Sequence, residues 1–185
     1  MKIFHVVLRT VLFVGLFIVG SSLSCSLFDK VDDVTFDIVV EHTFSIDASE
    51  NDPLSYSKKE TIDPSTNSEF AKYKDKIKEI TIKSVEYSVE NYSGEPGITF
   101  SNGKGTFVGT GTSAAASASL AFQDIQASVG QTFQLDYSTA GLDEIGNELE
   151  NLKKIDFQVS GNLSGVPVAF QVPVTITMTI KADAL

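Results

Sequence analysis

The chain of 185 residues contains one cysteine (Cys25), one arginine (Arg9) and no tryptophan. A lone cysteine cannot form an internal disulfide, so the fold must depend on its hydrophobic core. The missing tryptophan removes the best aromatic platform for a sugar. The scarcity of arginine removes the planar fork that grips phosphate and carboxylate ligands. Because His5 and His42 are the only histidines, the usual zinc ligand sets are excluded, and we expect no cofactor.

The first 25 residues have the parts of a secretory signal. Lys2 and Arg9 form a short basic region, residues 11–20 carry no charge, and small residues then lead to Cys25. A basic start, a short apolar run and a small-residue cleavage site define such signals. The sequence therefore predicts a signal peptide at residues 1–24.

An uncleaved membrane anchor is the alternative. The uncharged run is shorter than the ~20 residues that span a bilayer. Residues 3–8 would lengthen it, but Arg9 would then lie near the middle of the membrane, at a cost of ~2.5–3.5 kcal/mol. The charge of Arg9 thus favours cleavage.

Ser24 and Cys25, at the end of this signal, resemble the lipobox of bacterial lipoproteins, although Ser22 stands where that motif usually has an aliphatic residue. The resemblance implies that the Cys25 thiol carries diacylglycerol, that the chain is cut just before it, and that the new amino group is acylated, as by palmitate. Two or more acyl chains hold a protein stably on a membrane. Residues 25–33 would then be a lipidated tether; a free cysteine in a secreted protein is the alternative.

The rest of the chain is acidic. The whole sequence has a formal net charge of −10, and loss of Lys2 and Arg9 with the signal would make the mature charge more negative still. Such a surface repels nucleic acid and anionic lipid head groups and tolerates cationic partners. We therefore expect no nucleic-acid partner. By length, residues 34–185 make one domain.

Alternating polar and apolar residues predict several β-strands. In the second of them the alternation changes parity, and a β-bulge near Lys83–Ser84 would restore one buried face. The predicted strands are 34–46, 79–92, 98–101, 105–109, 120–127, 131–137, 155–160 and 166–181.

The remaining segments are predicted as turns, loops and two short helices. Helical spacing and a capping Asn67 or Ser68 indicate a helix to about Asp75 and another at 143–152. Asn102–Gly103 is a strong hairpin dipeptide. Pro167 and Pro173 suggest that the first half of the last strand lies at a sheet edge or bends. The loops expected are 47–66, 93–97, 161–165 and Thr110–Ser119, the last of which could instead be an edge strand.

These elements predict an all-β fold: an antiparallel two-sheet sandwich, immunoglobulin-like in the broad sense, with one or two short helices. The lipobox, the segment Tyr92–Gly103 and the threonine-rich last strand together resemble small outer-membrane lipoproteins of unknown function from Bacteroidota-type bacteria. The resemblance implies an outer-membrane address, facing the periplasm or the cell surface. It implies no ligand and no site residues beyond lipid attachment at Cys25.

No residue set predicts a catalytic centre. His42 lies on the apolar side of its strand pattern, which indicates a buried or edge histidine bonded to the backbone. The Gly161–Gly165 segment lacks the spacing of a nucleophile elbow, so we interpret it as a turn. The acidic groups around Asp32 and around Glu50 lack the ligand spacing of a calcium loop, which indicates solvated loops. Paired carboxylates for glycoside hydrolysis would have no specificity among 24 acidic residues.

The sequence thus favours a membrane-anchored lipoprotein that acts as a non-enzymatic binding or structural module of the cell envelope. It would contact the membrane through the lipid on Cys25 and meet another envelope protein or a glycan through loops or a sheet edge. Two alternatives stay open: a carboxylate-based glycan-processing enzyme, and a fimbria-like component of a surface assembly.

Overall fold

The computed structural model describes residues 33–109, 115–120, 122 and 124–184. Within these residues the chain forms nine strands, two α-helices and three single turns of 3-10 helix. In chain order they are β1 (Asp33–Ala48), β2 (Ser55–Ile62), η1 (Pro64–Thr66), α3 (Ser68–Tyr73), η2 (Lys74–Lys76), β3 (Ile77–Ser88), β4 (Glu90–Gly94), β5 (Phe100–Val108), β6 (Ala115–Ser119), η3 (Gln126–Ser128), β7 (Thr132–Gln134), α4 (Thr139–Leu152), β8 (Ile155–Leu163) and β9 (Val168–Asp183).

The strands form two antiparallel sheets, so the predicted all-β sandwich is confirmed. One sheet has the order β1-β9-β3-β7, with β4 also paired to β9, and the other has the order β2-β8-β5-β6. β1 and β9 pair over all sixteen residues of each. In true immunoglobulin domains the first strand lies in the sheet opposite the last one. Here they are neighbours in one sheet, so only the broad two-sheet likeness applies.

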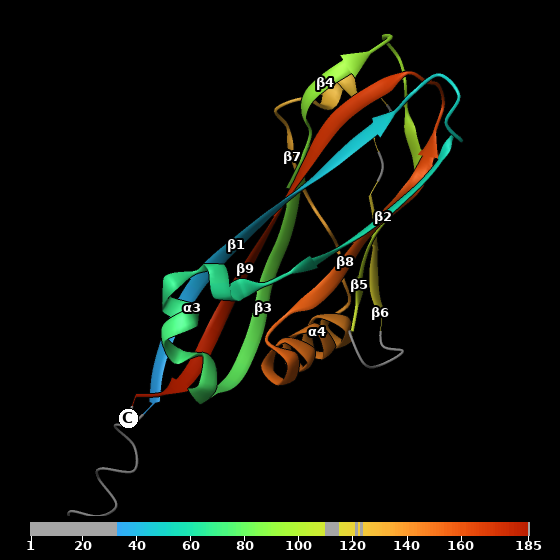
Figure 1. Ribbon diagram of the computed structural model, residues 1–185. Helices are drawn as coiled ribbons and strands as arrows, with labels where there is room; N and C mark the ends of the chain where they lie inside the picture. The colour runs from blue at the N-terminus through green and yellow to red at the C-terminus, as the bar shows by residue number, and fades with distance from the viewer. Residues whose placement is uncertain (1–32, 110–114, 121, 123, 185) are drawn as a thin grey trace, which may run out of the picture.

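The molecule is elongated, and both termini of the described body lie at one end (Figure 1). Asp33 at the start of β1 is paired with Asp183 at the end of β9, and α3 lies beside them. A strand of sixteen residues is ~50 Å long, so β1 carries the chain along most of the molecule. No helix among the described residues is long and apolar enough to cross a bilayer.

The β-bulge predicted in the second strand is present. The pairing of β3 with β9 shifts register between Ile82 and Ser84, so that Lys83 stays exposed. Ile82 before the bulge and Val85 after it are both buried. The extra residue therefore restores one continuous apolar face, as the change of parity in the sequence required.

Of the two alternatives for the proline-containing half of the last strand, an edge position or a bend, the edge position is wrong, because β9 is central. Pro173 pairs with Thr43 of β1 on one side. On the other side, pairing with β3 ends at Val174 and pairing with β4 begins at Gln171. Pro173 thus lies opposite a break in the ladder, where a missing N–H costs no hydrogen bond.

Residues 47–66 are not all loop, as the sequence suggested. Residues 55–62 form β2, the edge strand of the second sheet, which pairs with β8 along its whole length. Its inward row contains Tyr56, Lys58 and Glu60 as well as the buried Ile62. The sequence of this strand lacks the usual alternation of polar and apolar residues, because two of these four inward side chains are charged.

The predicted hairpin at Asn102–Gly103 is also wrong, since β5 runs through this dipeptide as one strand. Asn102 has a positive φ of 51°, and the pairing of β5 with β8 shifts register between Ser101 and Lys104. The dipeptide therefore forms a bulge. Opposite it, the Leu120 N–H donates to the Gly103 carbonyl oxygen at 2.8 Å.

In the alanine-rich region the strand begins earlier than the favoured prediction placed it, and the edge-strand alternative is confirmed for residues 115–119. Residues 115–119 form β6, which pairs with β5, whereas a strand was expected at 120–127. There the described residues make only a single bridge, between Phe122 and Phe100, followed by η3. Residues 110–114 lie outside the described part, so the loop expected there is untested. Small side chains paired with β5 form an edge strand although they lack an apolar pattern.

Both predicted helices are confirmed. The Asn67 side chain caps α3 by accepting from the N–H groups of Glu69 and Phe70. Helix α4 begins at Thr139, four residues before the predicted start, because the Ser138 hydroxyl accepts from the Gly141 N–H at 3.1 Å. α4 packs on β3 and on the end of the second sheet near β6.

Candidate functional site

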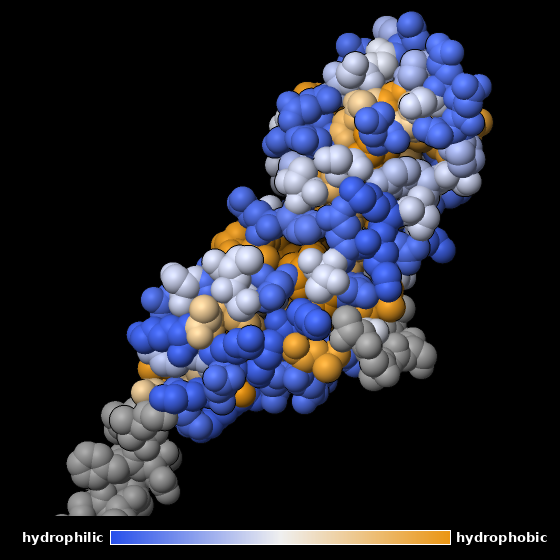
Figure 2. Space-filling model, in the orientation of Figure 1, coloured by the Kyte–Doolittle hydropathy of each residue, from blue (hydrophilic) through white to orange (hydrophobic). Residues whose placement is uncertain are grey.

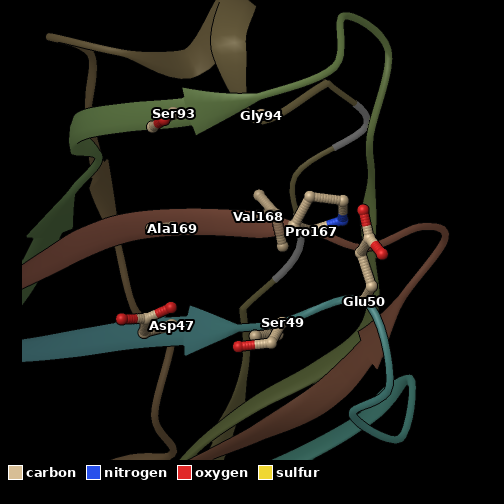
Figure 3. Close-up of a pocket in the computed structure, with 9 residues that line it drawn as sticks. Asp47, Ser49, Glu50, Ser93, Gly94, Pro167, Val168 and Ala169 are labelled. Atoms are coloured by element: carbon tan, nitrogen blue, oxygen red, sulfur yellow. The ribbon is translucent and has the colours of Figure 1, made fainter.

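A hollow lies at the end of the sandwich away from the termini. It has a volume of about 350 Å³ and is open to solvent. Figure 3 shows that the start of β9 lies between the end of β1, which carries Asp47 and is followed by Ser49, and β4, which carries Ser93. Glu50 reaches the same space near Pro167. We call it the distal groove, and its polar groups are two carboxylates and two hydroxyls.

The end of the sandwich around this groove is acidic. It is formed by residues 46–57, 89–103, 124–132 and 160–172, and we call it the distal end. These segments contain no lysine or arginine; their acidic residues are Asp47, Glu50, Asp52, Glu90, Glu95 and Asp124. Lys58 and Lys104 directly follow two of these segments, and Lys104 pairs with Ser160, so basic residues border this end. An excess of one sign of charge at one end of a molecule attracts ligands of the opposite sign.

The exposed surface offers no large apolar patch in the part of the chain that the structure describes. The large hydrophobic side chains left exposed lie on four separate segments: Val39, Leu54, Val129 and Leu152. Figure 2 shows polar residues over most of the visible face, with hydrophobic ones in separate areas. Single exposed hydrophobic residues are normal on protein surfaces. The charged and hydroxyl-bearing surfaces are therefore the candidates for recognition.

A second polar cluster lies where the two sheets meet along β1 and β2. The His42 Nε2 atom is 2.6 Å from Glu60 Oε2, and Lys58 Nζ is 2.6 Å from Glu60 Oε1. The side chains of His42 and Glu60 are only 26% and 27% exposed. These contacts join the inward rows of the two edge strands. We call His42, Lys58 and Glu60 the edge cluster.

Glu60 is the central group of the edge cluster. Partial burial raises the pKa of its carboxyl, but hydrogen bonds from Lys58 and His42 lower it by more, so the net pKa lies below the ordinary value. Burial beside this carboxylate also raises the pKa of Tyr56 to about 12. The Tyr56 hydroxyl donates to the Ser45 carbonyl oxygen at 3.1 Å, so it serves as a link between β1 and β2.

The lowered pKa of Glu60 predicts an acid-sensitive contribution to stability. The contribution is complete above the unfolded-state pKa of about 4.5 and is lost as the pH falls through the lower, folded-state pKa. We expect wild type to exceed Glu60→Gln by ~0.2–1 kcal/mol in free energy of unfolding at pH 5.5, because the pairs are partly solvated. The difference should shrink toward zero by pH 2.5, as measured by urea denaturation. Glu90→Gln is the control and should show no such trend; a constant difference for Glu60→Gln would contradict the assignment.

A third group of charges joins the two ends of the described body. Lys78 Nζ lies 2.7 Å from an Asp33 oxygen and also contacts Asp183, while Lys181 Nζ lies 3.0 Å from the other Asp33 oxygen. Hydrogen bonds from Lys78 and then Lys181 lower the pKa of Asp33. These exposed pairs link the start of β1, the end of β9 and the start of β3, so their role is structural.

The structure places the sequence candidates as follows. Cys25, the signal and the tether up to residue 32 lie outside the described residues. His42 is partly buried at an edge as expected, but its partner is the Glu60 carboxylate and not the backbone. Gly161 and Leu163 belong to β8, so the predicted 161–165 turn begins only at Ser164.

Sequence reasoning missed both the edge cluster and the distal groove. The only available signal for the cluster was the alternation of Tyr56, Lys58, Glu60 and Ile62 inside a segment of loop-like composition. The groove joins three segments that are distant in sequence, so no local pattern marks it. No group of three or more acidic, histidine or cysteine side chains among the described residues is arranged to hold a metal ion.

Comparison with known proteins gives no family. No model of a known protein family matches the chain, and no curated protein matches its sequence. Solved structures with some likeness include chains of Desmodium yellow mottle tymovirus (TM-score 0.34, 8% identity, 82% of this chain and 90% of that one) and of Turnip yellow mosaic virus (0.31, 9%, 82% and 96%). The decameric BFDV capsid protein gives 0.38 with 8% identity, over 80% of this chain and 99% of that one. At these values the likeness identifies neither a family nor a function.

Proposed function

We propose that this protein is a lipoprotein of the cell envelope, anchored through Cys25, whose β-sandwich is a non-enzymatic binding module. The observation that carries the proposal is that the start of the domain and the distal groove lie at opposite ends of the fold. β1 begins eight residues after Cys25, and the distal groove lies at the opposite end of the strand. An anchored chain would therefore hold its acidic distal end ~50 Å beyond the attached end.

The chemistry of the distal end supports a cationic or hydroxyl-rich ligand. Six acidic residues, with lysines only at the border of this end, would attract a positively charged segment of another envelope protein. The carboxylates of Asp47 and Glu50 and the hydroxyls of Ser49 and Ser93 would also suit hydrogen bonds to the hydroxyl groups of a glycan. Either ligand fits a surface with scattered apolar residues.

Fewer observations support the two alternative functions. A carboxylate-based glycan-processing enzyme needs two carboxylates across a cleft, and the carboxylates of the distal groove, Asp47 and Glu50, line an open hollow and not a deep cleft. A fimbria-like component that exchanges its terminal strand would leave a gap in its own sheet. Here β1 and β9 fill that place for each other along their whole length.

Replacement of the anchor cysteine tests the address. We expect Cys25→Ala to move the protein from the membrane pellet to the supernatant on fractionation, because the amino terminus would no longer carry two or more acyl chains. Intact mass of the wild-type protein from membranes should show loss of residues 1–24 and gain of the lipid. A Ser26→Ala variant, which keeps the thiol, should stay in the pellet. If Cys25→Ala fractionates as the wild type does, the anchor lies elsewhere.

Affinity capture with the purified lipoprotein tests the binding function. Chemical cross-linking in intact cells, followed by capture, should recover a defined envelope protein, or a glycan array should show a ligand. A variant with Asp47→Asn and Glu50→Gln should weaken that interaction, because it removes both charges from the groove. Recovery of no partner and no glycan would overturn the binding function whatever the fate of the anchor.

A further inference from the structure

β1 is an edge strand with one open side. It pairs with β9 over sixteen residues, and no described strand pairs with its other side. An open edge exposes N–H and C=O groups that a further strand can bind. Sixteen residues is long for such an edge, because strands in globular proteins usually have ~3–10.

The hydrogen bond to Ser45 shows which backbone N–H and C=O groups of β1 point to its open side, away from β9. The Ser45 carbonyl oxygen accepts from the Tyr56 hydroxyl at 3.1 Å, and Tyr56 belongs to β2, on the side away from β9. Backbone groups alternate sides along a strand, so those of Val39, Glu41 and Thr43 also point outward. No hydrogen bond from another described residue reaches them.

The open part of the edge has a defined length. At one end the Tyr56 and Lys58 side chains reach the Ser45 oxygen, and at the other end the Phe36 ring contacts Tyr73 of α3 at 5.2 Å between centroids. Figure 1 shows α3 beside the first half of β1. Residues 37–43 lie between these two covers, and within them the inward-facing side chain of His42 contacts Glu60 of β2. Seven residues extend for ~23 Å, which is enough for one added strand of ordinary length.

The solvent-facing side chains of residues 37–43 include two carboxylates, one on each side of an apolar residue. Asp37, Val39, Glu41 and Thr43 are all exposed, and the exposed fraction of Val39 is 50%. Asp37 accepts a hydrogen bond from Thr179 of β9, whereas Glu41 has no ion-pair partner among the described residues. Val39 is thus an exposed β-branched residue between two carboxylates.

The charges of Asp37 and Glu41 determine which kind of strand can bind to this edge. A second copy of the chain, paired antiparallel across this edge, would bring the carboxylates of Asp37 and Glu41 against those of its twin. Like charges on facing strands are destabilising, and opposite charges are stabilising. The complementary strand has lysine or arginine at two positions that flank an aliphatic residue.

We propose that residues 37–43 of β1 bind an extended cationic segment of another envelope protein as an added strand of the sheet. This deepens the proposed binding function and rests on it. The added strand would lie on the side of the molecule, so this surface is separate from the distal groove. Main-chain hydrogen bonds would hold the segment, and the alternating charges would select it.

A designed peptide tests this edge directly. The probe is a capped seven-residue peptide with lysine at positions 2 and 6, valine at position 4 and threonine elsewhere, which reads the same in both directions. We expect it to bind the full-length lipoprotein in detergent micelles. Hydrogen–deuterium exchange should then slow at the amides of residues 37–43 and not at the distal end.

Two controls separate strand addition from general attraction to an acidic protein. The same peptide with alternate backbone amides N-methylated keeps its charges but cannot pair, and it should not bind. Glu41→Lys should weaken binding of the unmethylated peptide at least ten-fold. Glu86→Lys, on the same sheet but on β3, makes the same change of net charge and should change binding less than two-fold.

The outcomes are distinct. Equal binding of the N-methylated peptide, protection elsewhere than residues 37–43, equal effects of the two lysine variants or no binding would each overturn the proposal. Protection of residues 37–43 without peptide, rising with protein concentration, would mean that a second copy takes the edge and would overturn it too. If the Glu41→Lys lipoprotein still captures a defined envelope partner as the wild type does, only the edge inference fails. If the wild type captures none, the binding function fails first.

Discussion

Replacement of Phe157 by alanine should lower the free energy of unfolding by ~3–5 kcal/mol, the range found for buried Phe→Ala changes. Phe157 is fully buried near the start of β8. Its ring lies 4.6 Å from the ring of Phe107 on β5 and 5.5 Å from that of Phe44 on β1, measured between centroids. The side chain thus joins neighbouring strands of one sheet to the opposite sheet, and its loss opens a cavity between them.

Urea denaturation of the two proteins measures this effect, with Leu54→Ala as the matched control. Leu54 is 48% exposed, so its truncation should cost less than about 0.5 kcal/mol. Since a domain is stable by only ~5–15 kcal/mol, the Phe157 variant should also unfold at a clearly lower temperature. A loss under about 1 kcal/mol would show that the sheets do not depend on this aromatic contact.

The strands that carry an apolar row were predictable from the sequence, and those without one were not. In β1 and β9 every second residue is apolar over long stretches, and the inward row is correspondingly buried. In β2 the inward row contains Lys58 and Glu60, which are held by each other and by His42 from the other sheet. A strand whose inward charges are neutralised by a distant residue has no local pattern to reveal it.

The position of Pro173 was mispredicted for a similar reason. Proline has no backbone N–H and cannot donate a hydrogen bond to a neighbouring strand, so an edge position is the natural expectation. The structure meets that requirement in a central strand, because the partner on one side is interrupted between β3 and β4. The interruption is a property of another segment, some 85 residues earlier, and the proline itself contains no information about it.

The sequence allowed the chemistry of the candidate sites to be predicted, but not their positions on the molecule. The acidic balance of the chain and the scarcity of arginine already favoured cationic ligands over phosphate. The segregation of acidic residues at one end appears only when the segments around Asp47, Glu90 and Asp124 are brought together. The open edge of β1 likewise depends on the position of β2, which the sequence did not show to be a strand.

Gly103→Ala should destabilise the protein by at least about 2 kcal/mol, although glycine-to-alanine changes at compatible positions usually stabilise by ~0.4–1 kcal/mol. A Cβ atom at position 103 would lie 1.5 Å from the Leu120 carbonyl oxygen, which is backbone and cannot rotate away. Relief of the clash must move residue 120 away from β5. That movement breaks the 2.8 Å hydrogen bond from Leu120 N–H and disturbs the adjacent bridge between Phe100 and Phe122.

Gly165→Ala is the matched control, because the added Cβ would meet only Ile98 side-chain atoms at 3.6 Å and 3.7 Å. That is ordinary van der Waals contact, so the change should be neutral or slightly stabilising in urea denaturation. The comparison also separates the two interpretations of Asn102–Gly103. In a solvent-facing hairpin turn, alanine at position 103 would be penalised only for its backbone conformation, and Leu120 would be unaffected. In a bulge pressed against another segment, hydrogen exchange at the Leu120 amide should rise together with the loss of stability. An unchanged Leu120 amide in the Gly103→Ala variant would contradict the close approach of these two segments.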